Sequence, residues 1–155
     1  MRRRIRLLRY AFLVASVGWA AFLPAAAWMA GRAYAPAPWH EAAAAVYGVG
    51  GLICHQLPVR SFHLRGVQMP VCARCTGIYA GAAMVSLLML TFPRREPPRV
   101  SRVTLLAAAV PTVLTLVFEW WTGQMPSNWI RAAAGLPIGA IVTGLVVAAT
   151  GDQVN

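Results

Sequence analysis

All three cysteines of this chain lie in residues 51–77, together with two of its three histidines. The segment reads GLICHQLPVRSFHLRGVQMPVCARCTG and is flanked by mostly apolar sequence. Zinc in proteins prefers four Cys or His ligands in a tetrahedron. Cys54 and His55 from one limb of this loop, with Cys72 and Cys75 from the other, would supply that number. The spacing therefore predicts a metal site, zinc in the first place.

The thiols of the Cys-x2-Cys pair share a further property. If Pro70 occupies the first turn of a helix, Cys72 and Cys75 lie on one face near its N-terminus, beside Arg74. Both features favour the thiolate, which is the form that binds metal or attacks a disulfide. Thiol–disulfide exchange, with Cys54 as partner, and cysteines that merely pack therefore stay open as alternatives.

The pair Cys54-His55 raises a geometric condition. Neighbouring residues on a helix point about 100° apart, so both can bind one ion only if the helix breaks there. The following Leu57-Pro58 favours such a break. Otherwise His63 or His40 would replace His55 as the fourth ligand.

The segment CHQLPVRSFHLRG followed by PVCARCTGIYAG resembles the signature of a bacterial and archaeal family of small predicted membrane proteins, known as domain of unknown function 2085. The resemblance covers most of the chain and implies a multi-span membrane protein, without an established activity. The matching residues are Cys54, His55, Gln56, Arg60, Ser61, Cys72, Arg74, Cys75, Gly77, Tyr79 and Gly81. We expect a supporting role for Gln56, Arg60, Ser61, Arg74, Tyr79 and Arg131.

The composition points to a membrane protein. Hydrophobic residues make up 59% of the 155 residues and charged ones only 12%, whereas soluble domains carry about 25% charged residues. A run of about 20 apolar residues crosses a bilayer as a helix. We predict an all-α polytopic protein, a single transmembrane domain over residues 1–155, with spans at about 10–31, 71–92, 103–121 and 129–150.

Two apolar segments each allow more than one interpretation. Residues 39–53 look helical, but their uncharged run is too short to cross, which predicts a short interfacial or re-entrant helix. Residues 10–31 resemble a cleaved signal peptide in part, but the apolar stretch exceeds the 7–15 residues of a typical signal core. A retained first span is therefore expected.

The net charge of +10 comes with arginine as the only basic side chain type besides histidine. The arginines flank apolar segments and form no nucleic-acid-binding module, so the expected partner is the lipid bilayer and not nucleic acid. The basic N-terminus and the arginine-rich turn at 94–102 then lie inside, in a bacterial cell membrane, with both termini cytoplasmic and the Cys loop outside. If residues 40–57 crossed the membrane, that loop would be cytoplasmic.

Glu119 is the only acid inside an apolar segment. An ionisable residue at membrane depth is a candidate for function, as a metal ligand, proton carrier or catalytic base. The alternative is an ion pair with Arg131 that fixes two helix ends. Two small-xxx-small pairs also predict that the second and fourth spans touch, namely Gly77 with Gly81 and Gly135 with Gly139.

Three functions follow from these patterns. The leading one is a membrane protein that holds zinc at its surface, either structurally or with an open position for water and hydrolysis. Nearby arginines would suit phosphate-bearing lipid substrates. The second is a membrane thiol–disulfide oxidoreductase that uses Cys72 and Cys75. The third is an assembly module without chemistry, so the patterns leave open whether the protein is an enzyme.

Overall fold

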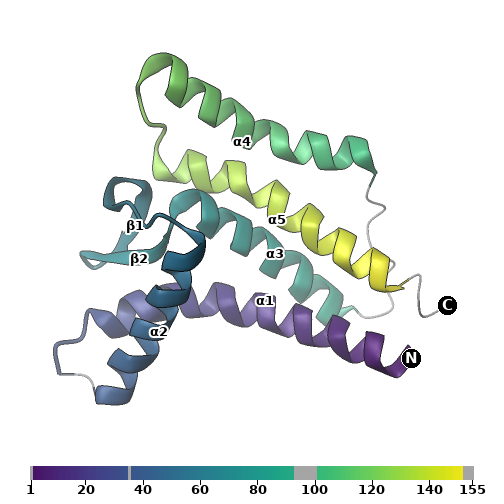
Figure 1. Ribbon diagram of the computed structural model, residues 1–155, viewed down its shortest axis with the longest axis horizontal. Helices are drawn as coiled ribbons and strands as arrows, with labels where there is room; N and C mark the ends of the chain where they lie inside the picture. Colours follow the sequence, from purple (N-terminus) through teal and green to yellow (C-terminus); the bar gives the residue numbers. More distant parts are fainter. Residues whose placement is uncertain (1, 35, 93–100, 152–155) are drawn as a thin grey trace.

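The computed structural model describes residues 2–34, 36–92 and 101–151 of the chain. Figure 1 shows a bundle of long helices with a small β-hairpin at one end. The fold is mostly α, as predicted. In chain order, the elements are α1 (Arg2–Ala30), α2 (Ala37–Ile53), η1 (Pro58–Arg60), β1 (Ser61–Leu64), β2 (Val67–Cys72), α3 (Ala73–Thr91), α4 (Arg102–Thr122) and α5 (Asn128–Gly151).

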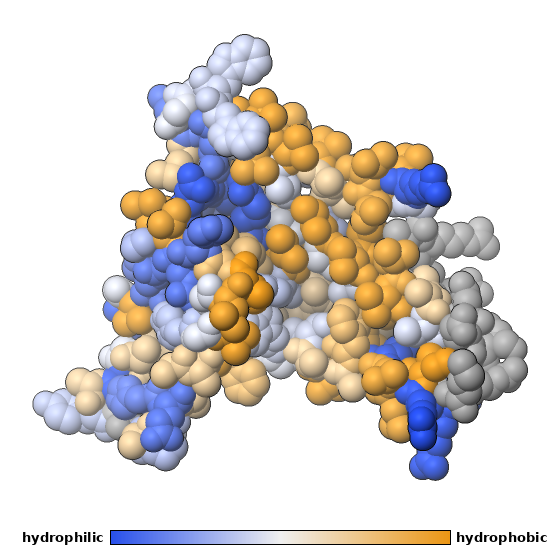
Figure 2. All heavy atoms as spheres, viewed as in Figure 1, coloured by the Kyte–Doolittle hydropathy of each residue, from blue (hydrophilic) through white to orange (hydrophobic). Residues whose placement is uncertain are grey.

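Four of the described helices, α1, α3, α4 and α5, are long and apolar enough to cross a membrane. They correspond to the four predicted spans, which confirms a polytopic membrane protein. Figure 2 shows hydrophobic side chains across the face formed by α4 and α5, and hydrophilic ones gathered at the hairpin end. On α4, large apolar side chains such as Leu106 and Leu114 are exposed by more than half. Such a surface is stable in lipid and costly in water.

Helices α3 and α5 form the tightest contact of the bundle. A Cβ on Gly77 would collide with the carbonyl of Ala132, and one on Gly139 with the carbonyl of Ile78. Gly81 and Gly135 likewise face the backbones of Leu136 and Arg74. The predicted contact between the second and fourth spans is therefore confirmed. At these four positions the helix backbones are so close that a larger side chain would not fit.

The β-hairpin was not predicted. Its antiparallel strands pair Ser61 with Cys72 and Leu64 with Val67, and its tight turn is made by Arg65 (φ 52°) and Gly66 (φ 84°). Two successive residues with positive φ match the twist of a hairpin. Residue 70, expected in the first turn of a helix, therefore lies in β2, and α3 begins only at Ala73.

The hairpin, the C-terminal end of α2, the N-terminal end of α3 and the connection between α4 and α5 all lie at one end of the bundle (Figure 1). The N-terminal end of α1 and the C-terminal end of α5 lie at the other. The segment expected to form a short interfacial or re-entrant helix is α2, which has 17 residues and is not among the candidate spans. The arginine-rich turn used for the orientation falls largely outside the described residues, at 93–100.

Candidate metal centre

Three free cysteine sulfurs meet at the hairpin end of the bundle. Cys54 follows the last residue of α2, Cys72 ends β2 and caps α3, and Cys75 lies in the first turn of α3. Their Sγ atoms all lie within 4.8 Å of one another, and all three side chains are partly buried. Four sulfurs at about 2.3 Å from a zinc ion stand about 3.8 Å apart. The cluster thus needs only a small contraction to hold a metal ion.

The C-terminal end of α2 is held against β2 by Gln56. This residue takes a left-handed conformation (φ 47°), from which its side-chain Nε2 donates to the carbonyls of Tyr47 at 2.8 Å and Pro70 at 2.7 Å. A Cβ on Gly50 would collide with the same Pro70 carbonyl. The backbone N–H of Cys72 then donates to the sulfur of Cys54 at 3.1 Å.

Ser61 holds the other side of the loop. Its buried hydroxyl donates to the carbonyl of Leu57 at 2.9 Å, and its own carbonyl accepts from the side chain of Asn128 at 3.0 Å. Gln68 on β2 donates to the carbonyl of Gln56. Ser61 and Gln56 thus position the loop through backbone groups. Gln68 and Asn128 were not predicted, because no motif distinguishes them from other amide side chains.

The structure does not bring a histidine to the sulfurs within the described ranges. His55, the predicted fourth ligand, is exposed and outside the cluster, and so are the alternatives His63 and His40. The backbone breaks at Cys54, as expected, but it becomes extended (φ −145°, ψ 138°). Successive side chains on an extended chain point to opposite sides. The sulfur of Cys54 points inward, so the adjacent His55 points outward.

The sulfur of Cys72 lies in surroundings that stabilise its thiolate. A hydrogen bond from the thiol of Cys75 is the main cause that lowers the pKa of Cys72, to about 5, and burial opposes it. Backbone N–H groups at the start of α3 and the thiol of Cys54 lower it further. Because the charged form is favoured, Cys72 is ready to bind a metal cation or to act as a nucleophile.

This low pKa predicts how Cys72 reacts in the metal-free protein. Carbamidomethylation of Cys72 by iodoacetamide, followed by peptide mass spectrometry, should reach half its maximal rate near pH 5, because the thiolate forms above that pH. The same protein in denaturant is the control and should show half-maximal rate near pH 8.5, about the value of an unperturbed cysteine. A midpoint above pH 8 in the folded protein would contradict the hydrogen-bonded thiolate.

Glu119 lies in a second polar cluster beside the first. Its buried carboxylate meets three arginines from three elements: Arg131 of α5 at 2.9 Å, Arg74 of α3 at 3.3 Å and Arg60 of η1 at 3.6 Å. The ion pair expected between Glu119 and Arg131 is therefore present, as part of a larger set. Glu119 is not among the metal-ligand atoms that cluster with the sulfurs. Its carboxylate is engaged by arginines from several sides.

Arg74 connects the two clusters. It stands between Cys72 and Cys75 in sequence, yet its side chain runs to Glu119 and Thr115 on α4. Adjacent helical residues point about 100° apart, so one turn of α3 can present sulfur on one side and a guanidinium on another. Thr115, which accepts from Arg74 at 3.1 Å, was also missed in the sequence.

Tyr79 lies one turn further along α3 and belongs to the apolar support of the sulfurs. Its ring meets Trp19 of α1 edge to face, with centroids 6.0 Å apart. Tyr79, Cys54 and Cys75 all pack against one buried cluster that includes Val71. Aromatic pairs of this geometry add to the stability of a packed core. The expected supporting role of Tyr79 is thus a packing contact in the structure.

Comparisons with known proteins give a family but no activity. An uncharacterized protein of Methanothermobacter thermautotrophicus is 36% identical over 87 residues, which cover 56% of this chain and 78% of that protein. An uncharacterized protein of Methanocaldococcus jannaschii is 44% identical over 57 residues, which cover 37% of this chain and 36% of that protein. No solved structure matches the chain. The pattern described as "Predicted membrane protein (DUF2085)" matches residues 54–145, and the chain therefore belongs to this family of predicted membrane proteins.

Proposed function

We propose that this membrane protein holds one thiophilic divalent metal ion, zinc in the first place, through Cys54, Cys72 and Cys75. The observation that carries the proposal is the convergence of three free sulfurs within 4.8 Å from three different segments. Thiolate is the ligand that zinc and similar soft ions prefer. The ion would tie the end of α2 to the hairpin and to the start of α3.

The fourth position decides what the metal does. A closed site with His55 would be structural, whereas three protein ligands and an exchangeable one are the arrangement of catalytic zinc. We favour the open arrangement, because the extended backbone at Cys54 directs His55 away from the sulfurs. An open position would supply a site for water activation, which is the chemistry of metal-dependent hydrolysis.

The test is the metal content of the protein purified in a neutral detergent without added metal. We expect about one zinc per chain by plasma mass spectrometry, and loss of that zinc in Cys54→Ser, since three-sulfur sites depend on each thiolate. His40→Ala, which changes an exposed histidine on α2, is the matched control and should keep its zinc. His55→Ala should also keep zinc if the fourth position is open.

A second measurement separates lost binding from lost folding. Wild-type protein stripped of zinc and loaded with cobalt should show intense near-ultraviolet charge-transfer bands from thiolate ligands. Cys75→Ser should lose intensity while its size-exclusion profile is unchanged. A wild-type protein that elutes as folded, yet contains no metal and takes up no cobalt, would refute the proposal.

Thiol–disulfide exchange is the second candidate, and the lowered pKa of Cys72 favours it. In that function the thiolate of Cys72 would attack a substrate disulfide, and Cys75 would displace the mixed disulfide, so that the substrate is reduced as Cys72 and Cys75 are oxidised. Metal-free protein with a reversible Cys72–Cys75 disulfide would support this candidate over the metal site. If the cysteine variants change neither folding nor phenotype, an assembly module without chemistry would be favoured.

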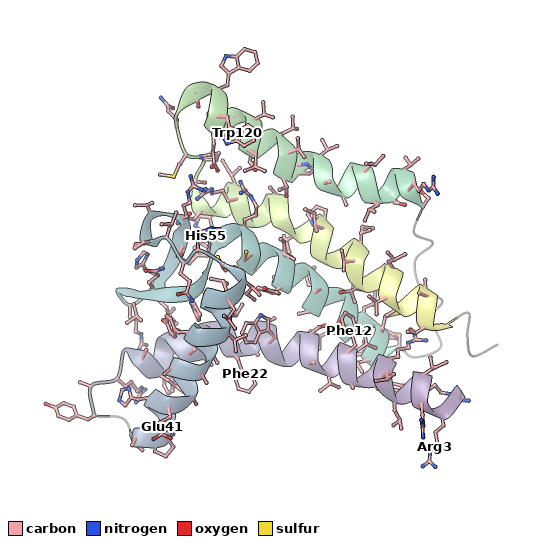
Figure 3. All side chains as sticks on the ribbon, in the orientation of Figure 1. Arg3, Phe12, Phe22, Glu41, His55 and Trp120 are labelled. Carbon is pink, nitrogen blue, oxygen red and sulfur yellow. The ribbon has the colours of Figure 1, made fainter. Side chains whose placement is uncertain are left out.

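We also propose that both termini lie in the cytoplasm of a prokaryotic cell and that the sulfurs face outward. The basic start of α1 supports this orientation, since arginines near membrane spans favour the inner side. His55 lies at the hairpin end and Arg3 at the opposite end of the bundle (Figure 3). In intact cells, a membrane-impermeant maleimide should therefore be found by peptide mass spectrometry on an added cysteine at position 65 but not on one at position 3, whatever the labelling of the three native thiols.

A further inference from the structure

The cluster around Glu119 carries more positive than negative charge. Three guanidiniums, those of Arg60, Arg74 and Arg131, converge on one carboxylate, so the group has a formal net charge of +2. The side chains of Arg131, Arg74 and Arg60 are 3%, 17% and 40% exposed. Charge that is removed from water in this way is costly unless an opposite charge is near. The carboxylate of Glu119 neutralises only one of the three positive charges.

The hydrogen bonds of the cluster are also distributed unevenly. Oxygen Oε1 of Glu119 accepts from both Arg131 and Arg74, whereas the one cation near Oε2 among residues 2–34, 36–92 and 101–151 is Arg60, at 3.6 Å. That separation is too long for a hydrogen bond. Nε of Arg74 is buried and has no hydrogen-bond partner in the described parts of the chain. Two of the three arginines therefore retain donors that an additional acceptor would satisfy.

The cluster lies where lipid headgroups are expected. Glu119 lies near the C-terminal end of α4, and Arg131 near the N-terminal end of α5. Around them Trp120, Trp121 and Trp129 are exposed by 84%, 85% and 77%. Trp120 is labelled at the hairpin end of α4 in Figure 3. Exposed tryptophans at helix ends mark the membrane–water interface, the level of the phosphate groups.

We propose that Arg60, Arg74 and Arg131 form a binding site for a phosphate group, either of an anionic lipid headgroup or free in solution. One guanidinium can bind two phosphate oxygens through two parallel N–H donors, and arginine is the residue best suited to this contact. Arg60, the most exposed of the three, lies at the entrance. Arg131 stays paired with Glu119, while the exposed guanidinium of Arg60 supplies the donors that a phosphate reaches first. Nε of Arg74 is buried and lies behind it, so it contributes a donor only once the side chains around it have shifted. The site does not depend on the metal centre.

The test uses the full-length protein in a maltoside detergent, which carries no phosphate. Its thermal unfolding is followed by tryptophan fluorescence during titration with inorganic phosphate, with chloride at equal ionic strength as reference. Parallel titrations use phosphatidylglycerol and the zwitterionic phosphatidylcholine. Stabilisation by phosphatidylglycerol beyond phosphatidylcholine identifies a lipid headgroup as the source, and stabilisation by inorganic phosphate identifies a free anion. Both results support the site.

Arg60→Gln should weaken the binding of the stabilising ligand about tenfold, as expected for the loss of one charge-assisted contact. Arg65→Gln removes the same charge from the exposed hairpin turn of the same loop and should leave the affinity unchanged. Arg60→Lys, which keeps the charge but loses the planar fork, should fall between Arg60→Gln and wild type. The proposal fails if neither ligand stabilises the wild type, or if Arg65→Gln and Arg60→Gln weaken binding equally. Zinc content should be unaffected in all three variants.

Discussion

Glu119→Gln is expected to lower the free energy of unfolding by about 3–5 kcal/mol, the cost of removing one partner from a buried ion pair. Three arginines share this carboxylate, and the Arg131 side chain is only 3% exposed. Glutamine keeps the shape of the side chain but removes its charge, so the guanidiniums are left to repel one another. The measurement is unfolding by a denaturing detergent, followed by circular dichroism.

The matched control is Glu41→Gln, which neutralises an exposed acid on α2 and should change stability by less than about 0.5 kcal/mol. A second variant tests the mechanism directly. Removing the buried positive charge as well, in Glu119→Gln with Arg131→Gln, should recover part of the lost stability. Equal stability of Glu119→Gln and wild type would show that the arginines do not depend on this carboxylate.

Gly139→Ala is expected to lower the free energy of unfolding by about 3 kcal/mol, which is the upper end of the usual effect of overpacking. The added Cβ would collide with the carbonyl of Ile78 and come 2.9 Å from the backbone nitrogen of Ala82. Backbone atoms of a helix cannot move individually, so α3 and α5 would have to separate. The same detergent unfolding assay reports the change.

Gly18→Ala on α1 is the control for this second prediction. A Cβ there has no atom within 4 Å in the described structure, so the same added methyl should be neutral or slightly stabilising. If both variants cost the same, the effect would come from helix propensity and not from close packing. A harmless Gly139→Ala would mean that α3 and α5 do not approach as closely as the structure shows.

The two predictions concern connected parts of the molecule. Gly135 faces the carbonyl of Arg74, and one turn earlier on α5 lies Arg131. The close approach of α3 and α5 thus brings two arginines to the same carboxylate on α4. The first turn of α3 also carries Cys75. We therefore expect Gly139→Ala to disturb phosphate binding and metal content as well as stability.

The transmembrane helices were determined by the sequence itself. Whether an apolar segment forms a transmembrane helix depends mainly on its own length and hydropathy, so both can be evaluated from the sequence alone. The glycine spacing predicted the contact of α3 with α5 for a similar reason, because a repeat of four places small residues on one face. Local sequence also placed the Cys-x2-Cys pair near the start of a helix, but only Cys75 lies in α3, because Cys72 ends β2 and caps the helix.

Tertiary structure decided the composition of the candidate site. Sequence spacing predicted His55 as a ligand, but the extended backbone at Cys54 leaves His55 exposed and outside the group of sulfurs. The next residue, Gln56, holds this loop to Tyr47 and Pro70, which are distant in the sequence. The hairpin was not predicted because its turn places Arg65 in the left-handed backbone conformation, which residues other than glycine rarely adopt. The convergence of three arginines on Glu119 joins residues 12 to 59 positions apart. The short turn between two spans allowed the pair with Arg131 to be predicted, but no local pattern encodes the contacts with Arg74 and Arg60, since they exist only after the helices and the loop have packed together.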